Sequence, residues 1–160
     1  MRNKVNKILL DTTYLLPFFE IETDKFSKDD LQLLMNSSIN LFYNPISLVE
    51  IKWVLIRLSK RDKARFKKLK IIYSDAVDHL VYSDEIKQTL MLNGKISYLE
   101  DILLEAGVKD YFDRVIAATA KIFTGVLLTE DKELTKIVRS VNEFKDLEIM
   151  NWRELSRIIF

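Results

Sequence analysis

The chain has 160 residues, 48% of them hydrophobic, which is enough to bury the core of one domain and argues against intrinsic disorder. Its formal charge is +1, with 25 Lys plus Arg against 24 Asp plus Glu, so net charge points to no nucleic-acid or membrane partner. It has no cysteine and one histidine, which excludes a disulfide scaffold and a thiolate nucleophile, disfavours a Ser-His-Asp triad, and leaves carboxylates, hydroxyls and lysines for any catalysis.

No segment reaches the roughly 18–20 uninterrupted apolar residues that a membrane span needs. Residues 1–19 join a basic start to an apolar run, but Asp11 interrupts the run and no small-residue cleavage site follows. No stretch resembles a linker. We therefore expect one domain over residues 1–160, no membrane partner and a cytoplasmic location.

The first half of the chain alternates short apolar strands with helices. Residues 7–10 predict a buried strand that ends at Asp11, and Pro17 is compatible with a helix over 14–19 only in its first turn. Ser27, followed by Asp30, predicts the start of the next helix. The expected elements that follow are a strand over 39–43, a helix over 47–58 with Val49, Trp53 and Ile56 in the core, and a basic helical stretch over 61–70.

The second half continues the alternation. The expected elements are a strand over 79–82, a helix around 86–90 capped by Ser83, helices over 98–105 and 110–122, a strand over 125–128, a helix over 129–138, a strand over 147–150 and a helix over 152–160. Such alternation predicts an α/β fold.

Four acidic residues fall where helices follow strands. Asp11 comes directly after the first strand, and Glu50, Asp113 and Asp131 each fall in the first turn of a predicted helix. Because the carboxyl ends of parallel strands share one edge of a sheet, we expect these acids to meet there, Asp113 only if its helix points the same way. Carboxylate oxygens suit Mg²⁺ or Mn²⁺, and two such ions would activate a water and stabilise the leaving oxygen of a phosphodiester.

Each acid also has a simpler interpretation as a helix cap. Ser47 and Glu50 fit the S-x-x-E capping box, Asp110 and Asp113 fit a cap with an acidic third position, and Asp131 fits a charge at a helix N-terminus. Asp11 is harder to explain in this way, because it ends an apolar strand. Four acids gathered at one edge would repel one another without a cation, which favours the metal site.

Four segments, in this order, resemble the motifs of the PIN-domain family: I-L-L-D-T-T-Y-L-L, I-S-L-V-E-I, D-R-V-I-A-A-T-A and L-L-T-E-D-K-E-L. The size of the chain is similar to that of the VapC-type toxins, which act as ribonucleases in toxin–antitoxin pairs. The resemblance implies a single three-layer α/β/α domain with a central twisted parallel sheet, commonly dimeric. It also implies a divalent-metal-dependent endoribonuclease with an RNA substrate and, as a separate expectation, a toxin with an antitoxin partner.

The resemblance further implies roles for individual residues. The catalytic, metal-binding quartet would be Asp11, Glu50, Asp113 and Asp131, holding Mg²⁺ or Mn²⁺. Thr13 and Thr129 match hydroxyl positions that orient the acids or a metal-bound water, and Asp110 is a weaker candidate for the role of Asp113.

Residues 57–70 carry eight cations and one anion, a local charge of +7. Cations beside a metal site would position an RNA backbone, although charge runs are usually solvated helix faces. The candidates for RNA contact are Arg57, Lys60, Arg61, Arg65 and Lys68. His79 is expected to be structural, because its neighbours are apolar and no matched acid lies beside it. Trp53 and Trp152 are expected in the core, whereas Leu90, Met91, Leu99, Ile102 and Leu103 suit either a core or a dimer interface.

Two other functions compete with the nuclease. A non-catalytic RNA-binding or RNA-processing scaffold with a PIN-like fold would use the basic stretch and have no need of the acids. A phosphoacceptor receiver domain would need an acidic pair after the first strand, but Asp11 is followed by two threonines.

Overall fold

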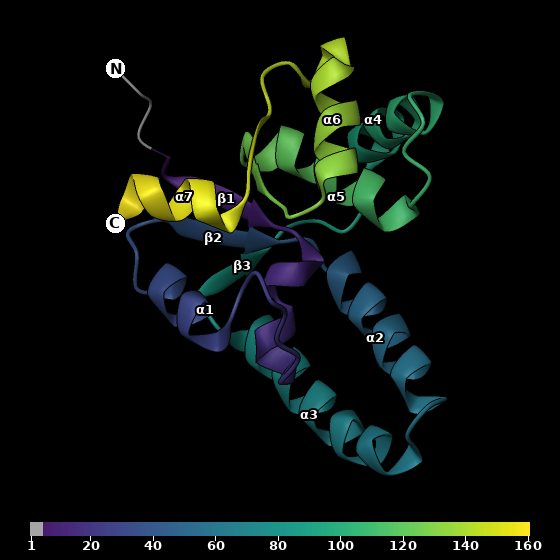
Figure 1. Ribbon diagram of the computed structural model, residues 1–160. Coiled ribbons are helices and arrows are strands. Elements are labelled where there is room, and N and C mark those ends of the chain that lie inside the picture. The colour runs from purple at the N-terminus through teal and green to yellow at the C-terminus, as the bar shows by residue number, and fades with distance from the viewer. Residues whose placement is uncertain (1–4) are drawn as a thin grey trace.

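The computed structural model describes residues 5–160, which form a five-stranded sheet with helices on both faces (Figure 1). The strands are β1 (Lys7–Leu10), β2 (Asn40–Tyr43), β3 (Ile86–Gln88), β4 (Val126–Leu128) and β5 (Glu148–Met150). Their order is β3-β2-β1-β4-β5, and every neighbouring pair is parallel. The predicted α/β class and three-layer arrangement are confirmed.

The helices form the two outer layers. They are α1 (Lys28–Met35), α2 (Ile46–Ser59), α3 (Lys63–Tyr82), α4 (Gly94–Glu105), α5 (Tyr111–Phe123), α6 (Lys132–Ser140) and α7 (Trp152–Ile159), with short 3₁₀ helices η1 (Thr12–Tyr14), η2 (Leu16–Phe19) and η3 (Asn142–Phe144). In Figure 1, α4, α5 and α6 lie together on one side of the sheet, while α2 and α3 form a hairpin that projects from the body. Among the helices of residues 5–160, none combines the length and apolar character needed to cross a membrane.

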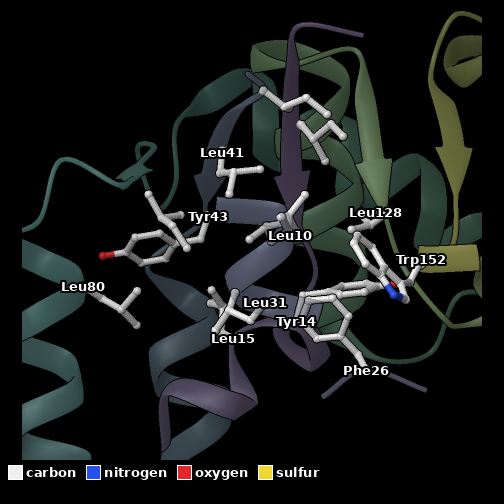
Figure 2. Close-up of a cluster of buried hydrophobic side chains, with 14 of the residues drawn as sticks. Leu10, Tyr14, Leu15, Phe26, Leu31, Leu41, Tyr43, Leu80, Leu128 and Trp152 are labelled. Carbon is white, nitrogen blue, oxygen red and sulfur yellow. Dashed lines mark hydrogen bonds between the residues drawn. The ribbon is translucent and has the colours of Figure 1, made fainter. Parts of the chain in front are cut away.

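Alternate residues of β1 enter two separate cores. Ile8 and Leu10 pack with residues of α1, α3 and α7, whereas Leu9 packs with residues of α4, α5 and α6. Figure 2 shows part of the first core, where the rings of Tyr14 and Trp152 both pack edge-on against Phe26. Because both faces are covered, the central strands are continuous apolar runs, which is why they were recognisable in the sequence.

The structure corrects the prediction for residues 79–90. Residues 79–82 are the end of α3 rather than a strand, and residues 86–90 contain β3 rather than a helix. The long α3 keeps Leu80 on its buried face, in step with Ala76. As an edge strand, β3 buries only Ile86 of its three residues, so its apolar pattern is too short to recognise.

Two further predictions near the N-terminus and in α2 are corrected. Residues 14–19 form 3₁₀ turns in place of an α-helix, although Pro17 does lie in the first turn of η2. Val49 and Trp53, expected in the core, are 45% and 56% exposed. The reason is that α2 leaves the body of the fold and buries only one face, which holds Leu48, Ile51 and Leu55. Trp152 is buried, as predicted.

The basic stretch is not one continuous helix. It begins in the last turn of α2, breaks before Asp62 and continues in α3. Asp62 caps α3, with its Oδ1 accepting a hydrogen bond from the Arg65 amide at 3.0 Å. His79 is exposed near the end of α3, with its Nε2 3.5 Å from Glu85 Oε2. It lines none of the cavities described below.

Candidate functional site

The four predicted acids reach one cavity at the carboxyl edge of the sheet. Asp11 follows β1, Glu50 is the fifth residue of α2, Asp113 the third residue of α5, and Asp131 the residue before α6. The cavity has a volume of about 310 Å³. Its lining consists of Asp11, Thr12, Thr13, Leu16, Glu50, Val54, Asp110, Asp113 and Asp131. Asp113 therefore joins the other three, because the start of α5 points to this edge.

Asp11 is buried at the centre of this site and is held by hydrogen bonds on both carboxylate oxygens. Its Oδ2 accepts a hydrogen bond from Thr129 Oγ1 at 2.6 Å, and its Oδ1 accepts one from the Thr12 amide at 2.7 Å. Thr129 Oγ1 also accepts a bond from the Asp131 amide at 3.1 Å, so one hydroxyl links the ends of β1 and β4 to the start of α6. Burial raises the pKa of Asp11, while the bonds from Thr129 and Thr12 oppose that rise.

Glu50 is held by the adjacent Thr12 and takes no part in a helix cap. The capping box predicted for Ser47 and Glu50 is wrong, because α2 begins at Ile46, whose amide donates to Asn44 Oδ1 at 2.8 Å. Instead, Thr12 Oγ1 donates to Glu50 Oε2 and lies 3.0 Å from Ser47 Oγ. Glu50 therefore takes part in the cavity wall.

Burial and neighbouring charges shift the ionisation of Glu50. The pKa of Glu50 is raised to about 7, mainly by burial and also by repulsion from Asp11 and Asp110, while Thr12 and Arg57 oppose the rise. A carboxylate in this state gains most from a nearby cation.

Thr12 is the site residue that the sequence reasoning missed. The D-x-[ST] pattern drew attention to Thr13, which lines the cavity but forms no side-chain hydrogen bond within residues 5–160. The position of Thr12 beside Asp11 was the only signal in the sequence. Its partner Glu50 lies 38 residues away and was brought near only by the fold.

The helix-cap interpretation is wrong for Glu50, but it is confirmed for Asp131 and for Asp110, with Asp113 as the acidic third residue of α5. Asp110 caps α5 by accepting from the amides of Phe112 at 2.8 Å and Asp113 at 3.3 Å, and Asp131 caps α6 by accepting from the Leu134 amide at 2.8 Å. The Asp113 carboxylate accepts no hydrogen bond from residues 5–160.

The site also disturbs the ionisation of Asp113. Burial and, to a smaller extent, the charges of Asp11, Asp110, Glu50 and Asp131 together raise the pKa of Asp113 to about 8. The carboxylates are thus near enough to repel one another through a partly dry cavity.

A buried ion pair fixes the loop that carries Asp110 and Asp113. Arg114 Nε donates to Glu100 Oε2 of α4 at 2.7 Å, and Arg114 Nη1 donates to the carbonyl oxygens of Val108 at 2.9 Å and Lys109 at 2.7 Å. Arg114 and Glu100 are both buried. The ion pair therefore anchors the start of α5 to α4 and to the loop between the two helices.

Part of the predicted basic surface lies beside the acidic cavity. A second cavity of about 360 Å³, which we call the basic pocket, is lined by Val54, Arg57, Leu58, Lys60 and Arg61. Val54 lines both cavities, so they are neighbours. Arg65 and Lys68 lie further along α3, are exposed and line neither cavity.

The donor set of the acidic cavity fits a hard divalent cation. The side chains that line it offer only oxygen donors, and the acids have raised pKa values that a cation would lower. Within residues 5–160, no three Asp, Glu or His side chains are close enough to coordinate one ion as they stand. An ion would therefore have to draw these carboxylates inward.

Comparison with known proteins identifies the family of the chain. Residues 8–139 match the PIN domain, so the chain belongs to the PIN-domain family. The fold is similar to the crystal structure of VapBC2 from Rickettsia felis bound to a DNA fragment from their promoter, with a TM-score of 0.58 and 15% identity. That similarity covers 91% of this chain and 98% of the other, and at this identity it establishes the fold alone. No curated protein matches the sequence.

Proposed function

We propose that this PIN-domain protein is an Mg²⁺- or Mn²⁺-dependent endoribonuclease that hydrolyses RNA phosphodiester bonds. The observation that carries the proposal is the acidic cavity, where carboxylates from four separate elements line one edge of the parallel sheet. No cysteine or histidine lines this cavity. Carboxylate–metal chemistry suits such a set of side chains.

Asp11, Glu50, Asp113 and Asp131 would hold the metal. Bound Mg²⁺ or Mn²⁺ supplies activation of a water and stabilisation of the leaving oxygen. The chain's own contribution is to hold the carboxylates: Thr129 orients Asp11, Thr12 orients Glu50, and Arg114 anchors the start of α5. Such supporting contacts tune a metal site as strongly as its ligands do.

The basic pocket supports RNA as the substrate. Arg57, Lys60 and Arg61 are exposed and adjacent to the acidic cavity, where they can bind phosphates on one side of the scissile bond. Such contacts position a nucleic acid without reading its sequence. Arg65 and Lys68 would extend this surface along α3.

Cleavage of a labelled single-stranded RNA by the purified chain tests the activity. We expect cleavage with Mg²⁺ or Mn²⁺, none with EDTA, and none by Asp11→Asn, whose amide keeps an oxygen for the Thr12 amide so that the fold is retained. The matched control is Asp24→Asn, a change at an exposed acid outside the cavity. RNA binding that survives EDTA and Asp11→Asn, without any cleavage, would identify the non-catalytic scaffold and contradict the proposal.

We further propose that the protein acts as the toxin of a toxin–antitoxin pair, with an antitoxin that binds over the acidic cavity. Support comes from the similarity of the fold to the VapBC2 structure. Expression without a partner should arrest bacterial growth, whereas Asp11→Asn should not. Normal growth at high expression of the unaltered chain would contradict the toxin role and leave the ribonuclease untouched.

We also propose a homodimer. Leu103 is buried within the chain, but Leu90, Met91, Leu92 and Tyr98 are exposed near the start of α4, and they form an apolar surface suited to a second copy. Light scattering at micromolar concentration should give twice the 18.9 kDa mass of the chain. A monomer mass at all concentrations would contradict the dimer.

A further inference from the structure

A third cavity adjoins the acidic site on the side away from the basic pocket. It has a volume of about 430 Å³ and lies between α6, the end of β5 and the start of α7. We call it the α6–α7 cleft. Its walls include Lys132, Lys136 and Arg139 of α6, Ile149 and Met150 of β5, and Asn151. Its lining also includes Thr129 and Asp131, which belong to the acidic site described above.

The cleft is a neighbour of the acidic cavity. Asp131 lines both, and Thr129, which lines the cleft, donates the 2.6 Å hydrogen bond to Asp11. Val54 lines both the acidic cavity and the basic pocket. In the strand order β3-β2-β1-β4-β5, the basic pocket belongs to α2, which follows β2, and the cleft lies at the end of β5, so the two flank the acids that follow β1 and β4.

The cleft is lined by three cations, Lys132, Lys136 and Arg139, and by three acids, Glu130, Asp131 and Glu154. Lys132, Lys136 and Arg139 follow one another at spacings of four and three residues, so they share one face of α6. Within residues 5–160, neither lysine forms an ion pair. Arg139 Nη2 donates to the carbonyl oxygen of Ile149 at 2.9 Å, which ties α6 to the floor of the cleft.

The acids of the cleft, in contrast, are already bound. Glu130 Oε1 accepts from the Tyr14 hydroxyl at 2.6 Å and from the Trp152 amide at 3.1 Å. Glu154 Oε2 accepts from the Asn151 amide at 2.9 Å within the capping box of α7. Asp131 Oδ1 likewise accepts from the Leu134 amide at 2.8 Å, so the acids are held by contacts within the fold, whereas Lys132 and Lys136 are exposed and can reach a phosphate.

The rest of the lining includes apolar residues and the polar Asn151. Ile149 and Met150 of β5 line the cleft but are nearly buried. Asn151 Oδ1 caps α7 by accepting from the Glu154 amide at 2.9 Å, which leaves its amide group as a donor. Cations along one wall of a groove are one element of a single-strand nucleic-acid site, where they follow the phosphate backbone.

We infer that the α6–α7 cleft holds the RNA nucleotides on one side of the scissile phosphate, while the basic pocket holds those on the other side. The inference rests on the proposed function, and it assigns Lys132 and Lys136 to substrate binding. An endonuclease needs a path for the strand on both sides of its catalytic centre, and the cleft supplies the second half of that path.

The test compares two double variants of the full chain. Lys132→Glu/Lys136→Glu reverses the charge of the cleft, and Lys28→Glu/Lys145→Glu makes the same net change at exposed lysines outside it. Lys132 is in the first turn of α6, where Glu complements the helix dipole, so the fold is retained, as thermal melting will check. The probe is a fluorescent single-stranded RNA, with binding measured in the Asp11→Asn background and cleavage in the unaltered background.

We expect the cleft variant to weaken RNA binding about tenfold and to reduce the slope of log affinity against log salt by about 1.4, since each lost phosphate contact removes about 0.7 for a single strand. The control should match the parent. A merely structural role for the lysines would not change the salt slope.

Three results would overturn the inference. The first is a cleft variant that binds and cleaves RNA like the control, which leaves the ribonuclease proposal intact because the parent still cleaves. The second is a cleft variant with unchanged RNA affinity that loses binding of poly-L-glutamate, which assigns the cleft to an acidic protein. The third is a parent chain that neither binds nor cleaves RNA, which removes the proposed function as well.

Discussion

The acidic cavity and the tip of the α2–α3 hairpin are both strongly charged, but the fold holds them in opposite ways. Asp11 is only 7% exposed, and each of its oxygens accepts a hydrogen bond. Arg57, Lys60 and Arg61 are exposed, and within residues 5–160 they form no ion pair. The acids of the cavity are therefore held in fixed positions at a cost in desolvation, whereas the cations of the hairpin tip stay solvated and cost little.

The two regions also use their acids differently. Asp62 at the tip stabilises the fold by capping α3, in contact with solvent. Asp113 in the cavity forms no capping hydrogen bond, and burial together with the neighbouring carboxylates raises its pKa to about 8. We therefore expect variants of the cavity to change the chemical step and variants of the tip to change binding.

The largest expected effect is that of Asp113→Asn on catalysis. Loss of one metal-binding carboxylate should lower kcat by about 100-fold or more, a loss of the size seen when one charge-stabilising group is removed from an active site. RNA affinity should stay near that of the parent. Single-turnover cleavage at saturating RNA measures the effect, with Asp101→Asn on the exposed face of α4 as the control. A kcat equal to that of the control would remove Asp113 from the catalytic site.

A smaller effect, on binding alone, is expected at the tip. Lys60→Glu/Arg61→Glu should raise KM about tenfold and flatten its salt dependence while kcat stays unchanged, because exposed cations act through phosphate contacts. Lys87→Glu/Lys95→Glu makes the same charge change at exposed lysines outside the three cavities. A change in kcat with constant KM would contradict the view that the tip acts in RNA binding and the cavity in the chemical step.

The metal-free protein should be stabilised by Asp113→Asn, with a sign that follows from the pKa of Asp113. The pKa is about 8 in the folded chain against 3.8 for the free group, so ionisation favours the unfolded chain and the free energy of unfolding falls as pH rises between these values. The gain in melting temperature from Asp113→Asn should therefore grow from pH 4 to pH 8, at about 2–4 °C for each 1 kcal/mol. Calorimetry in EDTA measures it. A gain independent of pH would mean that the Asp113 charge is not the cause.

The smallest and opposite effect is expected from Asp62→Ala. Loss of this cap should lower the free energy of unfolding by about 1 kcal/mol. Thermal melting with and without Mn²⁺ gives the comparison: the metal should stabilise the parent and Asp62→Ala equally, because Asp62 lies outside the acidic cavity. Asp113→Asn, which lacks a proposed metal ligand, should gain less stability from Mn²⁺ than the parent. If Mn²⁺ stabilised Asp62→Ala as little as Asp113→Asn, the contrast between the two regions would be contradicted.

The elements that could be predicted from the sequence are those in which an apolar run along the chain corresponds to a buried strand. The strands β1, β2, β4 and β5 and the acids beside them were predictable, because central strands of a covered parallel sheet are apolar and helices begin at their ends. The edge strand β3 was not, since only Ile86 of its residues is buried.

The finer features of the site depended on contacts between distant residues. Glu50 looked like part of a capping box with Ser47, and only the fold shows that Thr12 holds it while Asn44 binds the Ile46 amide. The apolar spacing of Val49 and Trp53 suggested a core, but the projecting hairpin exposes both. The α6–α7 cleft joins segments whose charges gave no signal along the chain.

The most direct test of the central claim is anomalous diffraction from crystals of the protein grown with Mn²⁺. The claim predicts a manganese peak in the cavity lined by Asp11, Glu50, Asp113 and Asp131, and its loss in crystals of Asp11→Asn. A catalytically active protein whose Mn²⁺-soaked crystals show no peak in this cavity, or a peak only elsewhere, would contradict the assignment of the acidic cavity as the metal centre.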